Sequence, residues 1–166
     1  MNVDLHCHTN LSDGSLAPKE LIALAIERKI DVLAITDHDN IDCYGEIPPK
    51  TEGLTLISGI EFSTTWRNIG VHIVGLNMDL NNTELLEGIR FQSRARQKRA
   101  ELIDKKLQQL GIEGSLEGAK RFCQGQQVGR PHFAQYLVEI GAVSNMQQAF
   151  KRYLGARKAG DIKQQW

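Results

Sequence analysis

Six side chains in the first half of the sequence have the types and spacing of a metal site. They are His6, His8, Asp13, His38, Glu61 and His72. His6 and His8 are separated by one residue, so both imidazoles point to the same face of an extended chain. Imidazole and carboxylate groups together suit divalent cations. Cations held in this way can activate water for hydrolysis.

The positions of these residues relative to the predicted strands strengthen the metal interpretation. The predicted strands are Val3–Leu5, Val32–Thr36, Leu54–Ile60 and Val71–Leu76. His6 and His8 follow the first strand. His38 follows the second strand and Glu61 the third, whereas His72 opens the fourth. The carboxyl ends of parallel barrel strands converge on one face, and burying so many ionisable groups together is costly unless cations neutralise them.

Each of these residues, taken alone, has a simpler explanation. His72 could be a hydrogen-bonded histidine of the core or of a sheet edge. Asp13 lies in Ser12-Asp13-Gly14, which is ordinary turn chemistry. Glu61 could be a surface residue. Only their joint placement favours a shared metal site.

The elements that must position these residues have an α/β pattern. The apolar run Val32–Ile35 has no polar alternation, which favours a strand buried on both faces, as in a parallel sheet. The segment Pro18–Lys29 has a broad apolar face and predicts a helix with Pro18 in its first turn. The order strand, helix, strand predicts a βαβ unit within a sheet covered by helices.

The second half predicts helices and carries the opposite charge. Helices are expected at Glu84–Leu110, Pro131–Ile140 and Asn145–Leu154, and the change of pattern falls near Asp79–Thr83. Residues 1–80 hold 5 basic and 12 acidic side chains, whereas residues 81–166 hold 15 basic and 8 acidic ones. Arginines such as those of Arg94–Arg99 bind phosphate through two parallel hydrogen bonds. A plain solvated surface is the alternative.

The composition excludes several classes of protein. A chain of 166 residues, 41% hydrophobic and 24% charged, can bury a core and is neither a disordered tail nor a collagen-like repeat. No apolar run approaches the roughly 18 residues that span a bilayer, so no membrane association is expected. Cys7, Cys43 and Cys123 have no CxxC spacing and indicate free thiols in the cytoplasm. The sequence shows no pattern of a covalent nucleophile and no glycine-rich phosphate loop.

Five motifs of the first half resemble the PHP (polymerase and histidinol phosphatase) family. They are Asp4–Thr9, Ser12–Gly14, Ala34–Asp39, Gly59–Glu61 and Val71–Gly75. The second half is similar to one bacterial branch, the 3′,5′-nucleoside bisphosphate phosphatases that also act as 5′→3′ exoribonucleases. That branch carries a helical insertion resembling Glu84–Leu154, with a segment like Val128–Ala134. The resemblance therefore covers essentially the whole chain.

The resemblance implies an α/β fold, the N-terminal part of a distorted (β/α)7 barrel followed by a mostly helical insertion. The expected domains are residues 1–81 for the barrel half, 82–158 for the insertion and 159–166 for the start of the return to the barrel. The family completes its metal site with a histidine and an Asp-x-His pair from the second half of the barrel, and this sequence ends at Trp166 before either could occur; its last histidine, His132, lies in the expected insertion. We therefore expect a truncated chain whose site is incomplete for catalysis.

The resemblance also implies the ligands of two to three divalent ions, with manganese first and zinc, iron or magnesium as alternatives. His6 and His8 would hold one metal, Asp13 and His38 a second, Glu61 would bridge the first and third, and His72 would join the third. The expected contacts to substrate phosphates are Arg94, Arg96, Gln97, Arg99, Arg130, Pro131, His132 and Phe133. No catalytic residue is identified apart from the metal ligands.

The leading hypothesis is a metal-dependent phosphoesterase in which activated water attacks phosphorus. Its substrate would be a nucleoside 3′,5′-bisphosphate or the 5′ end of a short RNA, and no obligate protein partner is inferred. Two alternatives stay open, an amidohydrolase-like metal hydrolase and a metal-stabilised RNA-binding module without catalysis. The contiguous Thr36-Asp37-His38 and the arginine-rich insertion favour phosphate over amide substrates.

Overall fold

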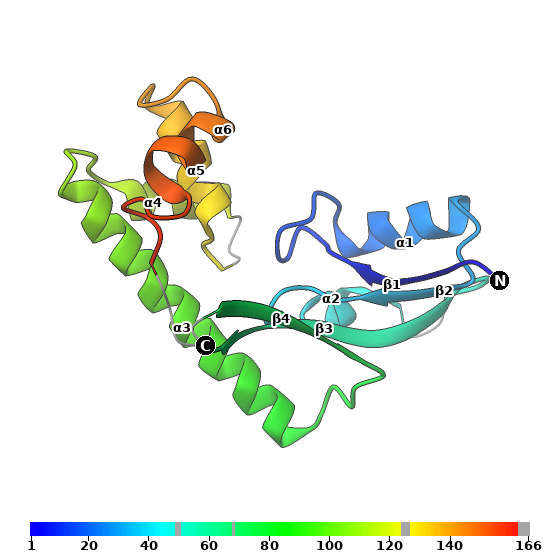
Figure 1. Cartoon of the computed structure of the whole chain (residues 1–166). Coiled ribbons are helices and arrows are strands. Elements are labelled where there is room, and N and C mark those ends of the chain that lie inside the picture. Colours follow the sequence, from blue (N-terminus) through cyan, green and yellow to red (C-terminus); the bar gives the residue numbers. More distant parts are fainter. Residues whose placement is uncertain (49–50, 68, 124–126, 163–166) are drawn as a thin grey trace. The chain divides into compact units, whose positions relative to one another are not determined.

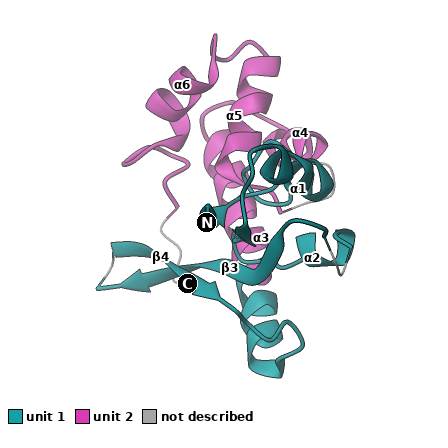
Figure 2. Cartoon of the chain, turned by 90° about the vertical axis from the view of Figure 1, so that its right-hand side faces the viewer, with its two compact units in different colours: residues 1–92, 166 teal, residues 93–165 magenta. Residues whose placement is uncertain are grey.

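The chain folds into two compact units. The computed structural model describes residues 1–48, 51–67, 69–123 and 127–162. The first unit is Met1–Gln92 and the second is Ser93–Gln165 (Figure 2). The division falls inside one long helix, α3 (Thr83–Gln108), whereas the sequence analysis places a boundary between residues 81 and 82. Of the predicted return segment 159–166, residues 163–166 lie outside the described range.

The first unit has a mixed α/β fold built on a four-stranded sheet (Figure 1). Its strands are β1 (Val3–Cys7), β2 (Val32–Ile35), β3 (Thr55–Trp66) and β4 (Ile69–Leu76), in the order β1-β2-β3-β4. The strands β1, β2 and β3 are parallel, and helix α1 (Pro18–Glu27) connects the first two. The predicted βαβ unit is therefore confirmed.

Apolar burial explains the centre of this sheet. Leu33, Ala34 and Ile35 of β2 are at most 1% exposed, as expected for a strand covered on both faces. Ile22 and Ala25 of α1 belong to the same buried cluster as Leu33 and Ile35. The apolar face of α1 therefore covers one side of β2, and this packing fixes the ends of β1 and β2 relative to each other.

A partly buried tyrosine joins β2 to β3. Tyr44 lies in the short helix α2 (Cys43–Glu46), which the sequence analysis did not predict. Its hydroxyl accepts a hydrogen bond from the backbone N–H of Gly59 at 2.7 Å and lies 2.6 Å from the carbonyl oxygen of Ile35. Burial raises the pKa of this phenol, so Tyr44 keeps the proton that it donates. The contact holds the two strands in register beside the candidate site.

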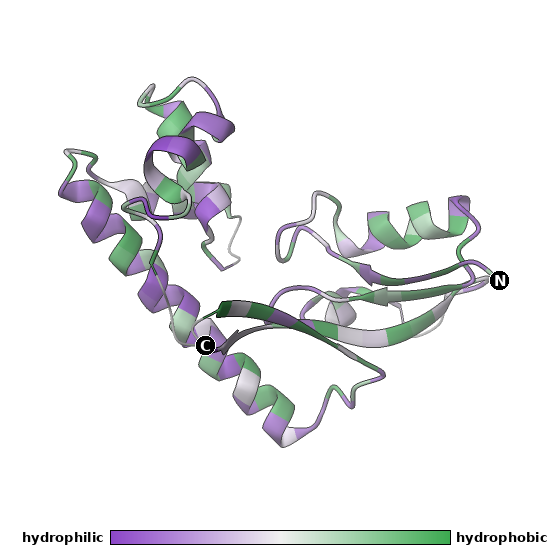
Figure 3. Cartoon of the chain, in the orientation of Figure 1, coloured by the Kyte–Doolittle hydropathy of each residue, from purple (hydrophilic) through white to green (hydrophobic). Residues whose placement is uncertain are grey.

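The third and fourth strands differ from their predicted positions. The strand β3 continues to Trp66, so Glu61 lies within the strand rather than after it. The strand β4 runs antiparallel to β3 and begins at Ile69, so His72 lies inside it and does not open it. β4 is one of the two outer strands of the described sheet, and its apolar residues Ile69 and Ile73 are 66% and 55% exposed. Figure 3 shows the apolar character of this strand in green.

The second unit is helical. After the C-terminal part of α3 it contains α4 (Ser115–Phe122), α5 (Arg130–Glu139), α6 (Met146–Ala149) and the π-helical turn η1 (Phe150–Leu154). Its core includes Leu107, Phe133, Leu137 and Leu154, all fully buried. No helix in the described part of the chain combines the length and apolar character needed to cross a membrane.

The predicted helices of the second unit are largely confirmed. α3 and α5 match the predicted Glu84–Leu110 and Pro131–Ile140 to within two residues at each end. The predicted helix Asn145–Leu154 is instead α6 followed by η1, and the Asn145 side chain caps α6 by accepting a hydrogen bond from the Gln148 N–H. Helix α4 was not predicted. Its N-terminus is held by Asp104, which accepts hydrogen bonds from the Ser115 hydroxyl and the Leu116 N–H.

Candidate metal centre

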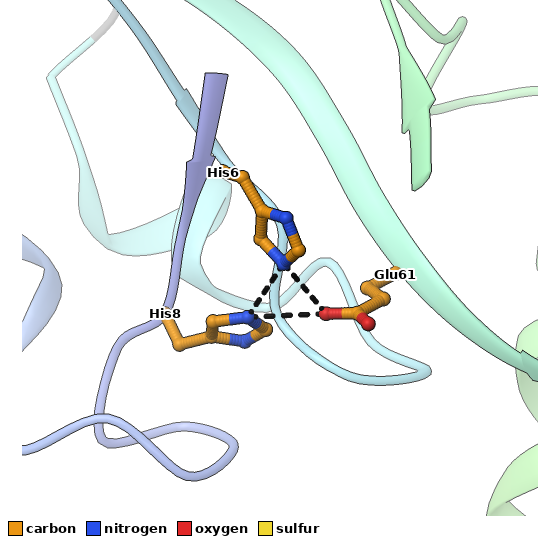
Figure 4. Close-up of side chains that lie close together, drawn as sticks. All are labelled: His6, His8 and Glu61. Atoms are coloured by element: carbon orange, nitrogen blue, oxygen red, sulfur yellow. Dashed lines mark hydrogen bonds and ion pairs between the residues drawn. The ribbon is translucent and has the colours of Figure 1, made fainter. Parts of the chain in front are cut away.

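Glu61 is the centre of the site in the first unit. Its Oε2 atom lies 2.9 Å from His6 Nε2 and 3.1 Å from His8 Nε2. Figure 4 shows the two imidazoles and the carboxylate pointing toward one another. On the other side of the carboxylate, Oε1 lies 2.8 Å from His72 Nδ1. A single buried carboxylate therefore contacts side chains from β1, the loop after it, and β4.

The sheet register explains why Glu61 and His72 meet. In the antiparallel pair of β3 and β4, Ser63 lies opposite His72. Glu61 is two residues from Ser63 on the same strand, so its side chain points to the same face. Glu61 and His72 are thus diagonal neighbours across the two strands. The antiparallel register, and not a shared carboxyl end, brings His72 into the cluster.

Asp13 and His38 complete the cluster. Asp13 Oδ1 lies 3.4 Å from His8 Nδ1, and Asp13 Oδ2 lies 3.5 Å from His38 Nε2. His38 forms an isolated parallel bridge with Glu61, and its Nδ1 lies 3.8 Å from Glu61 Oε2. The loop after β2 therefore pairs with β3 beyond the end of the regular strand, and this pairing places His38 beside Glu61.

The six predicted residues form three overlapping groups of potential ligands. They are His6, His8 and Glu61; His8, Asp13 and His38; and His38, Glu61 and His72. Within each group the ligand atoms all lie within 4.8 Å of one another. The structure thus brings together every residue that the sequence analysis placed at the metals. The shared members indicate adjacent sites rather than separate ones.

The electrostatics of the cluster favour ligands in their metal-binding form. Burial lowers the pKa of His8; Asp13 opposes this shift, and His38 adds to it. A neutral imidazole is the form that donates a lone pair to a metal. Burial pushes the pKa of Glu61 upward, but the hydrogen bond from His6 and the nearby His38 outweigh it, so the pKa is lowered. Glu61 is therefore ionised near neutral pH, among imidazole nitrogens that converge on it.

A layer of buried polar residues behind the ligands was missed by the sequence analysis. Asp37 is fully buried and accepts hydrogen bonds from the Thr9 N–H, the Thr9 hydroxyl and the Ser12 hydroxyl, at 2.6–2.7 Å. Asp39 is also fully buried, and its Oδ1 accepts a hydrogen bond from the Ser63 N–H at 2.7 Å. Both aspartates flank His38 within the motif Ala34–Asp39, and this position is the sequence signal that could have identified them. They orient the ligand-bearing loop and strand from behind.

The predicted phosphate-binding arginines lie in the second unit, where some of them cluster. Burial and the nearby positive charges of Arg130 and Arg96 together lower the pKa of Arg99 to about 10, although Asp161 opposes the shift. Arg130 is half-buried at the start of α5, and its Nη1 donates to the Leu154 carbonyl at 3.3 Å. Like charges gathered in a partly buried position favour the binding of an anion, which would relieve their repulsion.

The other predicted phosphate contacts have different surroundings. Gln97 donates to Glu101 at 3.4 Å, and Arg94 is exposed on α3. Pro131 is exposed in the first turn of α5. His132 Nδ1 accepts a hydrogen bond from the Gly129 N–H at 3.0 Å and so caps the same helix. Phe133 is fully buried in the core, so any contact that it makes with a phosphate would come from its backbone.

Comparisons with known proteins identify the relatives of this chain. It is 46% identical to a 5′-3′ exoribonuclease of Haemophilus influenzae, over 98% of this chain and 60% of the relative. It is 37% identical to a 3′,5′-nucleoside bisphosphate phosphatase of Chromobacterium violaceum, over 99% of this chain and 59% of the relative. The chain thus spans about three fifths of the length of these curated relatives.

The fold matches solved structures as well. A protein of Bifidobacterium adolescentis, described as a candidate metal-dependent phosphoesterase, superposes with a TM-score of 0.85 at 26% identity, over 99% of this chain and 59% of that one. The family model of the PHP domain matches residues 4–161, which include all six residues of the cluster. The chain therefore belongs to the PHP domain family.

Proposed function

We propose that the protein is a metal-dependent phosphoesterase that releases phosphate from nucleoside 3′,5′-bisphosphates and removes 5′ nucleotides from short RNA. The observation that carries this proposal is the convergence of four imidazoles and two carboxylates on one cluster. The names of the Haemophilus and Chromobacterium relatives support the two substrate classes.

The donor set of the cluster fits divalent cations. Nitrogen and carboxylate oxygen ligands suit manganese, our first choice, and also zinc, iron or magnesium. The overlapping groups support two or three ions: His6, His8 and Glu61 for one, Asp13 and His38 for another, and Glu61 with His72 for a third. When bound, the cations would lower the pKa of a coordinated water and neutralise charge on phosphate oxygens.

The chain's own residues would supply orientation and charge. Glu61 holds His6, His8 and His72 around one point through contacts of 2.8–3.1 Å. Arg99 and Arg130 would bind a phosphate of the nucleotide, because a guanidinium matches phosphate oxygens with two parallel donors. Binding of that phosphate would hold the nucleotide in place and so orient its scissile bond for attack.

The proposal also covers the complete fold and the location of the protein in the cell. The four strands of the first unit would form the beginning of a distorted seven-stranded barrel, and the second unit would be the helical insertion of the phosphatase branch. Cys7, Cys43 and Cys123 are free thiols, which supports a cytoplasmic location.

Phosphate release by the full-length protein tests the proposal. We expect manganese-dependent release of phosphate from adenosine 3′,5′-bisphosphate, loss of activity with a chelator, and recovery when the metal is restored. Cyclic amides, offered under the same conditions, test the amidohydrolase alternative. Retention of metal and RNA without release of phosphate would instead support a binding module.

A further inference from the structure

The second unit carries a compact group of exposed cations that the proposed function does not use. Lys151 and Arg152 lie in η1, and Arg157 and Lys158 lie in the turn that follows; all four are exposed. The sequence contains no aspartate or glutamate between Glu139 and Asp161. We call residues 151–158 the basic turn.

The basic turn differs from the cationic surface of α4 in the same unit. On α4, Lys120 pairs with Glu117 at 2.6 Å, and Arg121 pairs with Glu139. For the basic turn, the described residues include no carboxylate within ion-pairing distance of a cationic side chain. The positive charge of α4 is therefore largely neutralised by ion pairs. At the basic turn, the Asp161 carboxylate accepts a hydrogen bond from the Arg157 backbone N–H at 2.7 Å, so four cationic side chains face one carboxylate and a net positive charge remains for an external anion.

The backbone of the basic turn is held in one conformation. The Gly155 N–H donates to the Phe150 carbonyl at 2.8 Å, and the Gly160 N–H donates to the Tyr153 carbonyl at 2.7 Å. Leu154 is fully buried and anchors the segment in the core. A Cβ at Gly160 would lie only 2.7 Å from Leu154 Cδ2, so this close return of the chain requires glycine. The cations therefore stand on a fixed scaffold, which lowers the entropy lost on binding.

Two contacts point to a nucleic-acid strand as the anion. Arg130, a proposed phosphate ligand, donates to the Leu154 carbonyl at 3.3 Å, so the basic turn adjoins the arginine cluster within this unit. The Arg152 guanidinium lies 5.3 Å from the centre of the Tyr153 ring. An aromatic ring and a guanidinium both present flat faces on which an unpaired base can stack.

We propose that the basic turn binds the sugar-phosphate backbone of single-stranded RNA, on the 3′ side of the nucleotide held by Arg99 and Arg130. This inference rests on the proposed function and adds a surface that distinguishes RNA from a mononucleotide. A bisphosphate is too small to need it. An RNA strand has successive phosphates, each of which can replace condensed counterions with a lysine or arginine contact.

The test compares two matched double variants of the full-length protein. Arg157→Gln with Lys158→Gln removes two charges from the basic turn, without touching the bond from Arg130. Lys105→Gln with Lys106→Gln removes two exposed charges from the last turn of α3, in the same unit. The KM for adenosine 3′,5′-bisphosphate and for a 5′-phosphorylated ten-nucleotide oligouridylate is measured for each, and binding of the oligonucleotide is followed by fluorescence anisotropy across a salt series.

We expect the basic-turn variant to raise the KM and Kd for the oligonucleotide on the order of ten-fold, with the KM for the bisphosphate unchanged. The slope of log Kd against log salt should fall by about 0.7 for each lost phosphate contact. The α3 variant should match the wild type in all of these measurements. Equal oligonucleotide binding by the two variants would overturn the proposal.

The same measurements separate this inference from the proposed function. If the wild type releases neither phosphate from the bisphosphate nor nucleotides from the oligonucleotide, the proposed function fails, while the anisotropy series still decides whether the basic turn binds RNA. A second double variant of the basic turn, Lys151→Gln with Arg152→Gln, controls for a local folding defect in the Arg157→Gln, Lys158→Gln variant. Thermal unfolding of all variants should agree with the wild type, and a loss of RNA binding shared by both basic-turn pairs supports the surface.

Discussion

Asp37 accepts hydrogen bonds from both the backbone N–H and the hydroxyl of Thr9, at 2.7 and 2.6 Å, and is fully buried. A third bond from the Ser12 hydroxyl occupies the same carboxylate at 2.7 Å. Asp37 adjoins His38, while Thr9 and Ser12 belong to the loop between His8 and Asp13. This carboxylate therefore fixes the loop after β1 to the end of β2, where the candidate ligands of both segments meet.

The first prediction concerns Asp37→Asn. The amide keeps the shape but turns one acceptor into a donor that faces other donors. We expect a loss of about 1.5–3 kcal/mol in the free energy of unfolding, the usual value of a hydrogen bond to a charged group. Urea denaturation monitored by circular dichroism measures it, and metal analysis should show weaker metal binding because Asp13 and His38 are no longer held together.

Ser12→Ala is the graded control for this prediction. It removes one of the three bonds and leaves the carboxylate bonded to Thr9. We expect a loss of about 1 kcal/mol. Equal stability of Asp37→Asn and the wild type would show that the buried network contributes nothing.

The second prediction concerns Glu61→Gln. The substitution removes the charge that His6, His8 and His72 share, so metal occupancy and turnover should fall together. The fold should survive, because the apolar packing around β2 and β3 is untouched. Elemental analysis of the full-length protein and phosphate release measure the two effects.

Glu52→Gln is the matched control for Glu61→Gln, since Glu52 is an exposed carboxylate of the same unit. It should leave metal content and turnover unchanged. Normal metal content in Glu61→Gln would eliminate Glu61 as a ligand.

The third prediction concerns Arg130→Ala. If Arg130 holds a substrate phosphate, affinity for the bisphosphate should fall by about 1.5–3 kcal/mol, roughly ten- to a hundred-fold, with metal content unchanged. Arg130→Lys should recover part of this loss, because a point charge lacks the planar fork. A nucleotide monophosphate without the contacted group should bind the variant and the wild type almost equally.

The structure adds a control to this experiment. Arg130 also donates to the Leu154 carbonyl, so Arg130→Ala removes a bond within the second unit. Thermal unfolding must therefore be measured beside binding. Equal losses of affinity for the bisphosphate and the monophosphate would assign Arg130 to structure alone.

The fourth prediction concerns pH and His132. Burial lowers the pKa of His132 below the value of about 6.5 expected in the unfolded chain. The unfolded state then binds more protons, so this histidine's contribution to stability is complete above pH ~6.5 and is lost as pH falls toward the folded-state pKa. His132→Asn keeps an acceptor for the Gly129 N–H and removes the titration. Its free energy of unfolding should fall less than that of the wild type between pH 7 and 5, and parallel curves would contradict the assignment.

Sequence patterns correctly predicted the helices and strands that depend mainly on their own residues. The apolar run of β2, Pro18 at the start of α1 and the periodicity of α3 each contain their own signal, and the structure confirms them. The six cluster residues were also identified, because their types are rare beside apolar strands. For His72, however, the expected geometry was wrong. The strand pairs antiparallel, and register across β3 and β4 is a tertiary property that no single strand encodes.

The features that were missed depend on partners distant in sequence. The structural role of Asp37 depends on a hydrogen bond from Thr9, 28 residues away, which the local sequence does not indicate. The start of α4 depends on Asp104 of another helix, which accepts from the Leu116 N–H. The sequence motif around Phe133 does not indicate whether its side chain is buried. It therefore could not show that Phe133 belongs to the core and does not face a phosphate.

The exposed outer strand β4 has a consequence for the handling of this chain. Its residues, Ile69–Leu76, include no lysine, arginine, aspartate or glutamate and no proline, and within the described sheet only one of its edges is hydrogen-bonded. Natural sheets usually guard such an edge with charge or a bulge. At high concentration this stretch should act as a template for strand addition between molecules and seed fibrils or amorphous precipitate. A charged residue in place of Ile73, which is 55% exposed, is the substitution that would keep concentrated samples dispersed.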